Sequence, residues 1–342
     1  MGNRIDQIQL KNFGIIQQFS CNHFSNINLI IGENGTGKTF LLKALYSAIR
    51  SLEEYKRGDD IKTINEVLSE KLRWTFQVEK LGDMVSRSSA EELTLEMRSG
   101  IHRIHYQFSQ SASSKAGSVT APEKGMTGNS IFIPAKEVLS LFSVILKSRE
   151  VDKVFGFDDT YYDLAKALRI SPSRDKNSTA FSNSRKISRD VIDGKVEYDE
   201  NSGKWYFKNR KNQKFSIGAT SEGVKKIAIM DRLLGNGYLD NNSIIFIDEI
   251  ESALHPKAVC QFLDMIDMIA NDMGIQVFIT SHSYFVIKKL YLIALRQSNS
   301  VSCISLSKEQ EAQVYDLRDG MPENSIIDTS IRLYEEEIEE VL

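Results

Sequence analysis

The sequence predicts an α/β fold in which a mainly parallel sheet is flanked by helices. Residues 27–31, apart from Asn28, and residues 244–247 are apolar without alternation, as strands buried on both faces are. A helical period follows each of these runs, at residues 40–50 and 256–273. The chain has 342 residues, of which 41% are hydrophobic and 26% charged, and this composition is typical of a globular protein with a sizeable core.

The other elements can be assigned in chain order. Further strands are predicted at residues 5–10, 14–19, 74–78, 93–98, 101–108, 130–134, 276–280, 301–306 and 312–317, and helices at residues 51–72, 138–149, 224–234 and 284–296. The strands between residues 74 and 108 are expected to form an antiparallel meander, and the last two a hairpin. Residues 109–129 are rich in Ser, Ala, Gly and Thr and predict a loop, whereas residues 150–215 show only weak periodicity.

Composition excludes several classes of protein. The net charge of −3, from 43 Lys and Arg against 46 Asp and Glu, is not that of a general polyanion binder. No apolar run approaches the roughly 18 residues of a membrane span, and the N-terminus lacks a secretory signal. Three widely spaced cysteines form neither a disulfide framework nor a zinc motif. We therefore expect a cytoplasmic protein without a membrane partner.

A glycine-rich segment follows the first apolar strand. Residues 32–39, GENGTGKT, fit the pattern G-x-x-x-x-G-K-[ST] between a strand and a helix. Glycines let backbone N–H groups face an anion, and the following helix adds its positive end. Lys38 would contact the β- and γ-phosphates, and Thr39 would offer a hydroxyl to Mg²⁺. The sequence thus predicts ATP and Mg²⁺ as cofactors, rather than a plain glycine-rich turn, with these nucleotide-binding residues: Asn34, Gly35, Thr36, Gly37, Lys38 and Thr39.

Two carboxylates follow the second apolar strand. Asp248 and Glu249 would lie at the carboxyl edge of the sheet, where α/β proteins bind their ligands. We predict that Asp248, with Thr39, binds Mg²⁺ and that Glu249 is the general base that activates water. Taken alone, an apolar run that ends in two acids can also be a strand that meets a solvated loop.

Several motifs in a fixed order resemble the ABC-type ATPase heads of the SMC, RecF and OLD group, and the stand-alone AAA-type ATPases of prokaryotic defence systems. The opening IDQIQLKNFGIIQQF is similar to their first hairpin, GENGTGKT to their Walker A and IIFIDEIESALHP to their Walker B and D-loop. Residues 280–283, TSHS, are similar to the H-switch, and residues 221–226, SEGVKK, stand where the signature motif belongs. The resemblance covers about residues 1–145 and 215–310.

The resemblance implies one ATPase head, residues 1–342, that stacks head-to-tail with a second copy around ATP. Its parts would be residues 1–130 with Walker A and the β meander, 131–215 as a helical lobe and basic insertion, 216–320 with the signature, Walker B and H-switch, and 321–342 as an acidic tail. Catalysis would then depend on Lys38, Glu249 and His282. Ser221 and Gly223 would meet the γ-phosphate of the second copy.

Some of these residues have plainer explanations. Ser221 can be an ordinary N-cap and His282 a cap after a strand. The sequence also departs from the family pattern, because Glu222 replaces a glycine and Val224 a glutamine. No glutamine follows Pro134 where the family has its Q-loop. Exposed helix-start side chains are the favoured interpretation of Lys136 and Glu137, over contacts to nucleotide or metal.

The sequence is compatible with three functions. The first is an ATP-driven switch in anti-phage defence that controls a separately encoded effector, a nuclease in the usual case. The second is a RecF-like DNA-repair clamp, because residues 169–226 hold 14 Lys and Arg against 7 Asp and Glu, with Trp205, Tyr206 and Phe207 among them. The third, a transporter subunit, is disfavoured by the ALHP and KNF motifs. His102 and His105 lie three apart on a predicted strand and so make a poor metal pair.

Overall fold

The computed structural model describes residues 2–59, 61–171, 179–296, 300–308 and 311–341. Within residues 179–192 the side chains of residues 179–184 and 187 are not described. Three of the charges counted in the basic segment, Arg174, Asp175 and Lys176, lie outside the described residues.

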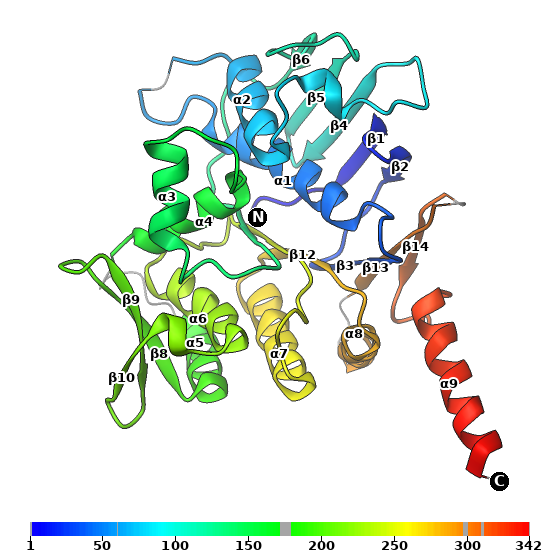
Figure 1. The fold of residues 1–342 in the computed structure, drawn as a ribbon. Helices are drawn as coiled ribbons and strands as arrows, with labels where there is room; N and C mark the ends of the chain where they lie inside the picture. The colour runs from blue at the N-terminus through cyan, green and yellow to red at the C-terminus, as the bar shows by residue number, and fades with distance from the viewer. Residues whose placement is uncertain (1, 60, 172–178, 297–299, 309–310, 342) are drawn as a thin grey trace.

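A six-stranded sheet forms the centre of the molecule (Figure 1). Its strands in spatial order are β14 (Gln313–Asp316), β13 (Val301–Leu306), β3 (Ile27–Gly32), β12 (Gln276–Thr280), β11 (Ile244–Ile247) and β7 (Ile131–Ile133). All of them are parallel except β14, which pairs antiparallel with β13. The predictions of a mainly parallel sheet and of a terminal hairpin are confirmed.

Alternate residues of these strands enter two different cores. Ile245 and Ile247 pack with the helices α4 (Asp159–Arg169), α6 (Glu222–Gly235), α7 (Pro256–Asp272) and α8 (Tyr284–Arg296). Ile244 and Phe246 pack on the other face, with α1 (Lys38–Glu54). Because both faces are covered, the strands carry no polar alternation, which is why the sequence shows continuous apolar runs.

A second sheet of five antiparallel strands lies over α1, in the order β2-β1-β4-β5-β6 (Figure 1). Its strands are β1 (Gln7–Phe13), β2 (Ile16–Cys21), β4 (Leu93–Ser99), β5 (His102–Phe108) and β6 (Ser118–Thr120). The meander is therefore present, and β6 lies within residues that the sequence predicts to be a loop. A short 3₁₀ turn, Leu81–Met84, precedes β4.

The predicted strand at residues 74–78 is wrong, because Trp74 lies in helix α2 (Ile64–Phe76). Thr63 and Glu66 form a capping box that starts this helix, and Gln77 ends it in the left-handed conformation. Trp74 packs edge-on against the ring of Phe155. The capping box therefore starts a helix that includes Trp74, although aromatic residues favour strands.

Residues 150–215 contain regular structure despite their weak periodicity. The helices here are α3 (Phe142–Glu150), α4 and α5 (Thr179–Ile192), and the strands are β8 (Gly194–Asp199), β9 (Lys204–Asn209) and β10 (Lys214–Ser216), followed by a 3₁₀ turn at Ile217–Ala219. The three strands form an antiparallel ribbon. Trp205 is buried between Phe142 and Tyr198, and this anchors the ribbon to the helices.

The chain ends in helix α9 (Ser325–Val341), which projects away from the body of the molecule (Figure 1). Ile327 is buried, whereas Ile331, Leu333, Tyr334 and Ile338 are exposed. The predicted acidic tail is thus largely helical and carries apolar side chains. Among the described residues, no helix combines the length and the apolar character that crossing a membrane would require.

Candidate functional site

The glycine-rich loop joins the end of β3 to the start of α1. Gly37 is the N-cap of α1 and adopts φ of 95°, and no side chain caps the helix. At Gly32 the φ is 146°, and an added Cβ would lie 2.4 Å from the carbonyl oxygen of Leu306. A glycine is therefore required here by space as well as by conformation. The uncapped N–H groups of the helix start suit an anion, so this loop fits a phosphate chain.

Lys38 closes the loop on itself. Its Nζ donates to the carbonyl oxygens of Gly32, at 2.8 Å, and Glu33, at 2.9 Å. Burial lowers the pKa of Lys38, and the carboxylates of Glu249 and Asp248 oppose this shift. The ammonium thus lies inside the loop, where the phosphates of a nucleotide would pass, while Asn34 and Gly35 are exposed at the loop tip.

The ends of two adjacent strands, β11 and β12, and the start of α1 meet at one carboxylate. Asp248 accepts hydrogen bonds from the hydroxyl of Thr39, at 2.9 and 3.1 Å, and from that of Thr280, at 2.7 Å. Thr280 in turn accepts from the backbone N–H of Glu249, at 2.8 Å. A hydroxyl beside a carboxylate is the hard oxygen chemistry that Mg²⁺ prefers, so the residues fit this metal.

Thr280 was not among the residues predicted for the site. It is the last residue of β12, between β3 and β11, and sequence reasoning treated it only as the first letter of the TSHS motif. One signal could have identified Thr280. It places a hydroxyl at the carboxyl end of a strand that lies between β3 and β11.

Glu249 has a left-handed backbone with φ of 43°. Such a conformation costs about 1–3 kcal/mol for a non-glycine residue and persists only where its surroundings enforce it. Lys226 of α6 supplies part of that enforcement, because its Nζ donates to the carbonyl oxygens of Asp248, at 3.2 Å, and Glu249, at 2.6 Å. Burial lowers the pKa of Lys226 to about 8, against the opposing effect of Glu251, Asp248 and Glu249.

Lys226 is the second site residue that sequence reasoning missed. In the sequence it is the last residue of the SEGVKK segment. Its position on the buried face of an amphipathic helix was the available signal, since a lysine there needs a partner.

His282 lies at the mouth of the site beside Glu251. Its Nδ1 is 3.4 Å from a carboxylate oxygen of Glu251, and its backbone N–H donates to the same oxygen at 2.8 Å. The imidazole is about half exposed, at 49%. The second oxygen of Glu251 is buried without a hydrogen-bond partner in the described part of the chain. His282 thus presents its ring outward.

The signature segment begins helix α6. Ser221 is its N-cap, as the plainer explanation predicted, but its exposed side chain makes no capping hydrogen bond. Gly223 is buried, and an added Cβ would lie 2.9 Å from the carbonyl oxygen of Ala253 and 2.9 Å from the side chain of Leu254. In the described structure neither Ser221 nor Gly223 is hydrogen-bonded to residues 32–39. The segment therefore packs on its own D-loop, with Ser221 facing outward.

The two departures from the family pattern have visible consequences. Glu222 pairs with Lys225 at 2.8 Å, and Lys225 also donates to the hydroxyl of Ser140 at 3.0 Å. The charge of Glu222 is thus balanced within the chain. Glu137 accepts from the backbone N–H of Ser140 and Lys136 is exposed. Both lie in the connection between β7 and α3, and α3 begins only at Phe142, so the expectation that they are exposed helix-start residues is wrong.

Comparison with family models finds two matches. Residues 80–288 match the family described as "AAA domain, putative AbiEii toxin, Type IV TA system", and residues 4–114 match an AAA ATPase domain. The second range contains the glycine-rich loop, and the first contains Asp248, Glu249 and His282. No curated protein matches the sequence.

Solved structures are similar over most of the chain. An SMC head bound to the C-winged helix domain of ScpA superposes with a TM-score of 0.55 at 11% identity, covering 92% of this chain and 98% of that one. The Smc head domain with an extended coiled coil, from Pyrococcus furiosus, gives 0.50 at 12% identity and covers 98% and 99%. The recombination mediator RecF gives 0.47 at 14% identity and covers 92% and 98%.

The two SMC heads establish the fold, an α/β ATPase head with mixed sheets flanked by helices. The first family model spans more than half of the chain, and the site described above lies within the two matched ranges together. The chain is an AAA-type ATPase with an SMC-like head fold and belongs to the family of AAA domains described as putative AbiEii toxins of type IV toxin–antitoxin systems.

Proposed function

We propose that the protein is an ATP-hydrolysing switch that dimerises head-to-tail around ATP and controls a separately encoded effector, a nuclease, in anti-phage defence. The observation that carries the ATPase part is the convergence of Thr39, Asp248 and Thr280 at one edge of the sheet. The family model, described as a putative toxin of a type IV toxin–antitoxin system, is compatible with a defence role.

Each site residue has a role in this proposal. The backbone of residues 34–39 and the ammonium of Lys38 would hold the phosphates, and Thr39 and Asp248 would hold Mg²⁺. When bound, this ion neutralises charge that develops on the phosphates. Glu249 would orient the attacking water and accept its proton, and its restrained backbone sets the point from which that side chain leaves the main chain. His282, at the exposed mouth, would contact the γ-phosphate.

The exposed N-terminus of α6 supports a head-to-tail dimer. Ser221 is exposed, no side chain caps the helix, and no hydrogen bond joins Ser221 to residues 32–39 in the described structure. A helix start of this kind suits a phosphate presented by another copy. Each copy would then complete the other's site.

Apolar surface at the C-terminal end supports a separate protein partner. Phe285 and Leu295 of α8 are 54% and 53% exposed, and Leu333 and Tyr334 of α9 are 58% and 64% exposed. Helices that leave large apolar side chains in water commonly mark a protein interface. We propose that the effector docks on α8 and α9.

The test is a pull-down of the Glu249→Gln protein with ATP from cells that express its neighbouring genes. Glutamine preserves shape but cannot accept the proton, so hydrolysis should fall by at least a hundredfold while ATP binding is kept. Mass spectrometry and native mass should then show an ATP-dependent dimer with a stoichiometric nuclease. Lys38→Ala, which removes the phosphate contact, is the control that should stay monomeric.

Other outcomes would reject parts of this proposal. Wild-type hydrolysis by Glu249→Gln would exclude Glu249 as the base. A bare dimer that retains duplex DNA would favour the RecF-like clamp instead, and retention on a membrane protein would favour the transporter subunit.

A further inference from the structure

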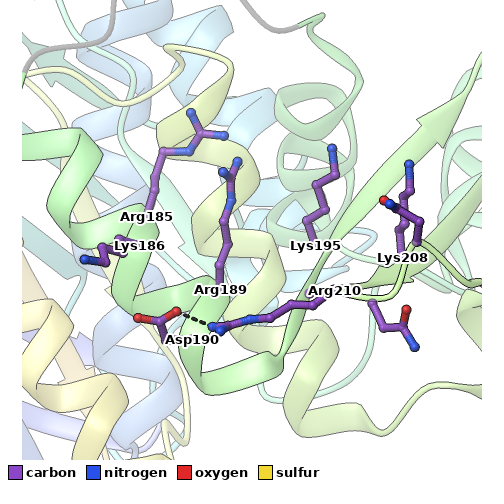
Figure 2. Close-up of a pocket in the computed structure, with 10 residues that line it drawn as sticks. Arg185, Lys186, Arg189, Asp190, Lys195, Lys208 and Arg210 are labelled. Atoms are coloured by element: carbon purple, nitrogen blue, oxygen red, sulfur yellow. Dashed lines mark hydrogen bonds and ion pairs between the residues drawn. The ribbon is translucent and has the colours of Figure 1, made fainter.

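A basic pocket of about 590 Å³ lies between α5 and the β8–β9–β10 ribbon, which Figure 1 shows at a distance from β3 and α1. Its charged lining consists of six cations and a single carboxylate. These are Arg185, Lys186 and Arg189 of α5, Lys195, Lys208 and Arg210 of the ribbon, and Asp190. Figure 2 shows side chains from the helix and from the ribbon facing the same open space. A concave site with this excess of positive charge attracts anions.

The ribbon places three lysines side by side. Lys208 of β9 is directly opposite Lys195 of β8 and directly opposite Lys214 of β10. Adjacent strands lie about 4.8 Å apart, so the three lysines form a row roughly 10 Å long on one face. Like charges directly opposite each other destabilise a sheet. Glu197 and Asp199 lie on the same face of β8 and pair with Lys195 at 2.6 Å and with Lys214 at 4.0 Å, which leaves Lys208, in the middle of the row, as the cation that an anion would still neutralise.

Carboxylates in and around the pocket pair with only some of its cations. Arg210 pairs with Asp190, the one carboxylate of the lining, and with Asp193 at 3.1 Å. Arg185 and Arg189 share one oxygen of Asp231, and the Nε of Arg189 is buried there without a hydrogen bond of acceptable geometry. Lys186 and Lys208 have no ion pair in the described part of the chain, whereas Lys195 pairs with Glu197 at 2.6 Å. Donors remain available for a ligand that carries several negative charges.

One aromatic ring lies on the face of the lysine row. Tyr206 is two residues from Lys208 on the same strand, and the Nζ of Lys214 lies 3.9 Å from the centre of its ring. The other two aromatics of the basic segment are not available, because Trp205 is buried and Phe207 packs toward the core. A partly exposed ring beside a row of cations is how proteins bind single-stranded nucleic acid, with bases stacked on the ring and phosphates on the cations.

We propose that this pocket and the lysine row bind a single strand of DNA or RNA through its phosphates, with one base stacked on Tyr206. This site is separate from the ATPase site, and its occupancy needs no ATP. It adds a nucleic-acid ligand to the proposed switch and does not depend on the identity of the effector.

The experiment measures fluorescence anisotropy of a labelled oligo(dT) strand, and of its RNA counterpart, with full-length wild-type protein without ATP over a range of salt. Binding should weaken linearly in log–log form as salt rises. The Lys186→Glu, Lys208→Glu double variant should lose at least tenfold in affinity, and its salt slope should fall by about 0.7 for each lysine removed. Tyr206→Ala should lose about tenfold with an unchanged slope.

Matched controls separate this site from general charge and from folding. Lys11→Glu, Lys80→Glu changes the same charge at exposed positions on the antiparallel lobe and should bind like wild type. ATP hydrolysis and thermal melting of the pocket variants should match wild type. The binding experiment is done without ATP, so its outcome does not depend on whether Glu249→Gln blocks hydrolysis.

Three results would overturn the inference. These are absence of binding at low salt, equal loss in the control double variant, and equal affinity for blunt duplex with no effect of Tyr206→Ala. Competition by inorganic pyrophosphate as effective, per molecule, as that by an unlabelled strand would show that the pocket takes a free polyphosphate instead, and would also overturn it.

Discussion

Lys226 fixes the main chain at the point where the candidate base projects from the sheet. Its ammonium contacts two consecutive carbonyl oxygens, and the second belongs to a residue with a left-handed backbone. Burying a lysine is unfavourable unless its donors are used, so this side chain is committed to holding those carbonyls. The backbone position of the candidate base thereby depends on a side chain of another element, α6.

Replacing Lys226 with methionine should lower kcat for ATP hydrolysis at least tenfold and leave KM for ATP nearly unchanged. Methionine preserves much of the volume but removes both donors, so Glu249 loses its position while the phosphate loop stays intact. Steady-state kinetics at fixed Mg²⁺ would measure kcat and KM for ATP separately.

The matched control is Lys225→Met. Lys225 is equally buried on the same helix but contacts Glu222 and Ser140 rather than the strand end. If both variants lose kcat equally, Lys226 acts only through the stability of α6.

At the scale of single elements, buried ion pairs connect helices α1, α2 and α4. Lys71 of α2 is 5% exposed and lies 3.1 Å from Asp159 and 2.9 Å from Asp163, both on α4. It also reaches Glu54 at the end of α1, at 3.0 Å. Burial alone would lower the pKa of Lys71, but Asp159, Asp163 and Glu54 raise it well above its usual value. One side chain therefore ties three helices together.

Lys71→Met should destabilise the protein by about 3–5 kcal/mol, because it leaves Asp159 and Asp163 buried with less compensation. Denaturant unfolding monitored by circular dichroism would measure this loss. Lys166→Met removes an exposed partner of the same Asp163 and should cost less than about 1 kcal/mol. If both variants lose the same free energy of unfolding, the ion pairs of Lys71 do not hold the three helices together.

The start of α2 should make stability depend on acid pH. The backbone N–H of Thr63 and the ammonium of Lys115 lower the pKa of Glu66 to about 2, from 4.5. A carboxylate whose folded pKa is depressed stabilises the fold above its unfolded pKa, and that stability is lost as pH falls through the folded value.

The free-energy advantage of wild type over Glu66→Gln should therefore be constant above about pH 5. It should shrink from pH 4.5 toward pH 2. Chemical denaturation across this range would measure it, with Glu91→Gln as an exposed control outside the helix. If the difference in unfolding free energy between wild type and Glu66→Gln does not change with pH, the ionised carboxylate of Glu66 is not the form that stabilises the fold.

At the scale of the whole molecule, the outward-facing Ser221 predicts how two copies meet. In the Glu249→Gln background, Ser221→Glu should abolish the ATP-dependent dimer and keep ATP binding, since a carboxylate there repels the other copy's phosphates. Native mass spectrometry and a nucleotide-binding assay would measure the two properties. Ser202→Glu, on the ribbon, should still dimerise, and a dimer that persists in Ser221→Glu would place the interface elsewhere.

The sequence predicts those parts of the molecule in which local pattern and tertiary environment agree. The parallel strands were found because burial on both faces removes polar residues, as in β11. Trp74 was misassigned because its β propensity was weighed without the cap at Thr63. The ribbon β8–β10 was missed because only alternate residues such as Val196 and Trp205 reach the core.

In the candidate site, too, local motifs were predictable and contacts that depend on tertiary packing were not. Residues 32–39 and Asp248 were predicted because their chemistry depends on adjacent residues. Thr280 and Lys226 act through contacts 32 and 23 positions away in the chain, which only the packing of β12 and α6 creates.

The closed form of the glycine-rich loop has a thermodynamic consequence. Lys38 bridges two carbonyl oxygens of the loop, so two internal hydrogen bonds restrain the segment. Little conformational entropy remains to be lost on binding, and the heat of binding should mainly reflect the exchange of carbonyl partners for phosphate oxygens. The change in heat capacity should accordingly be small, unlike that of a loop that folds around its ligand.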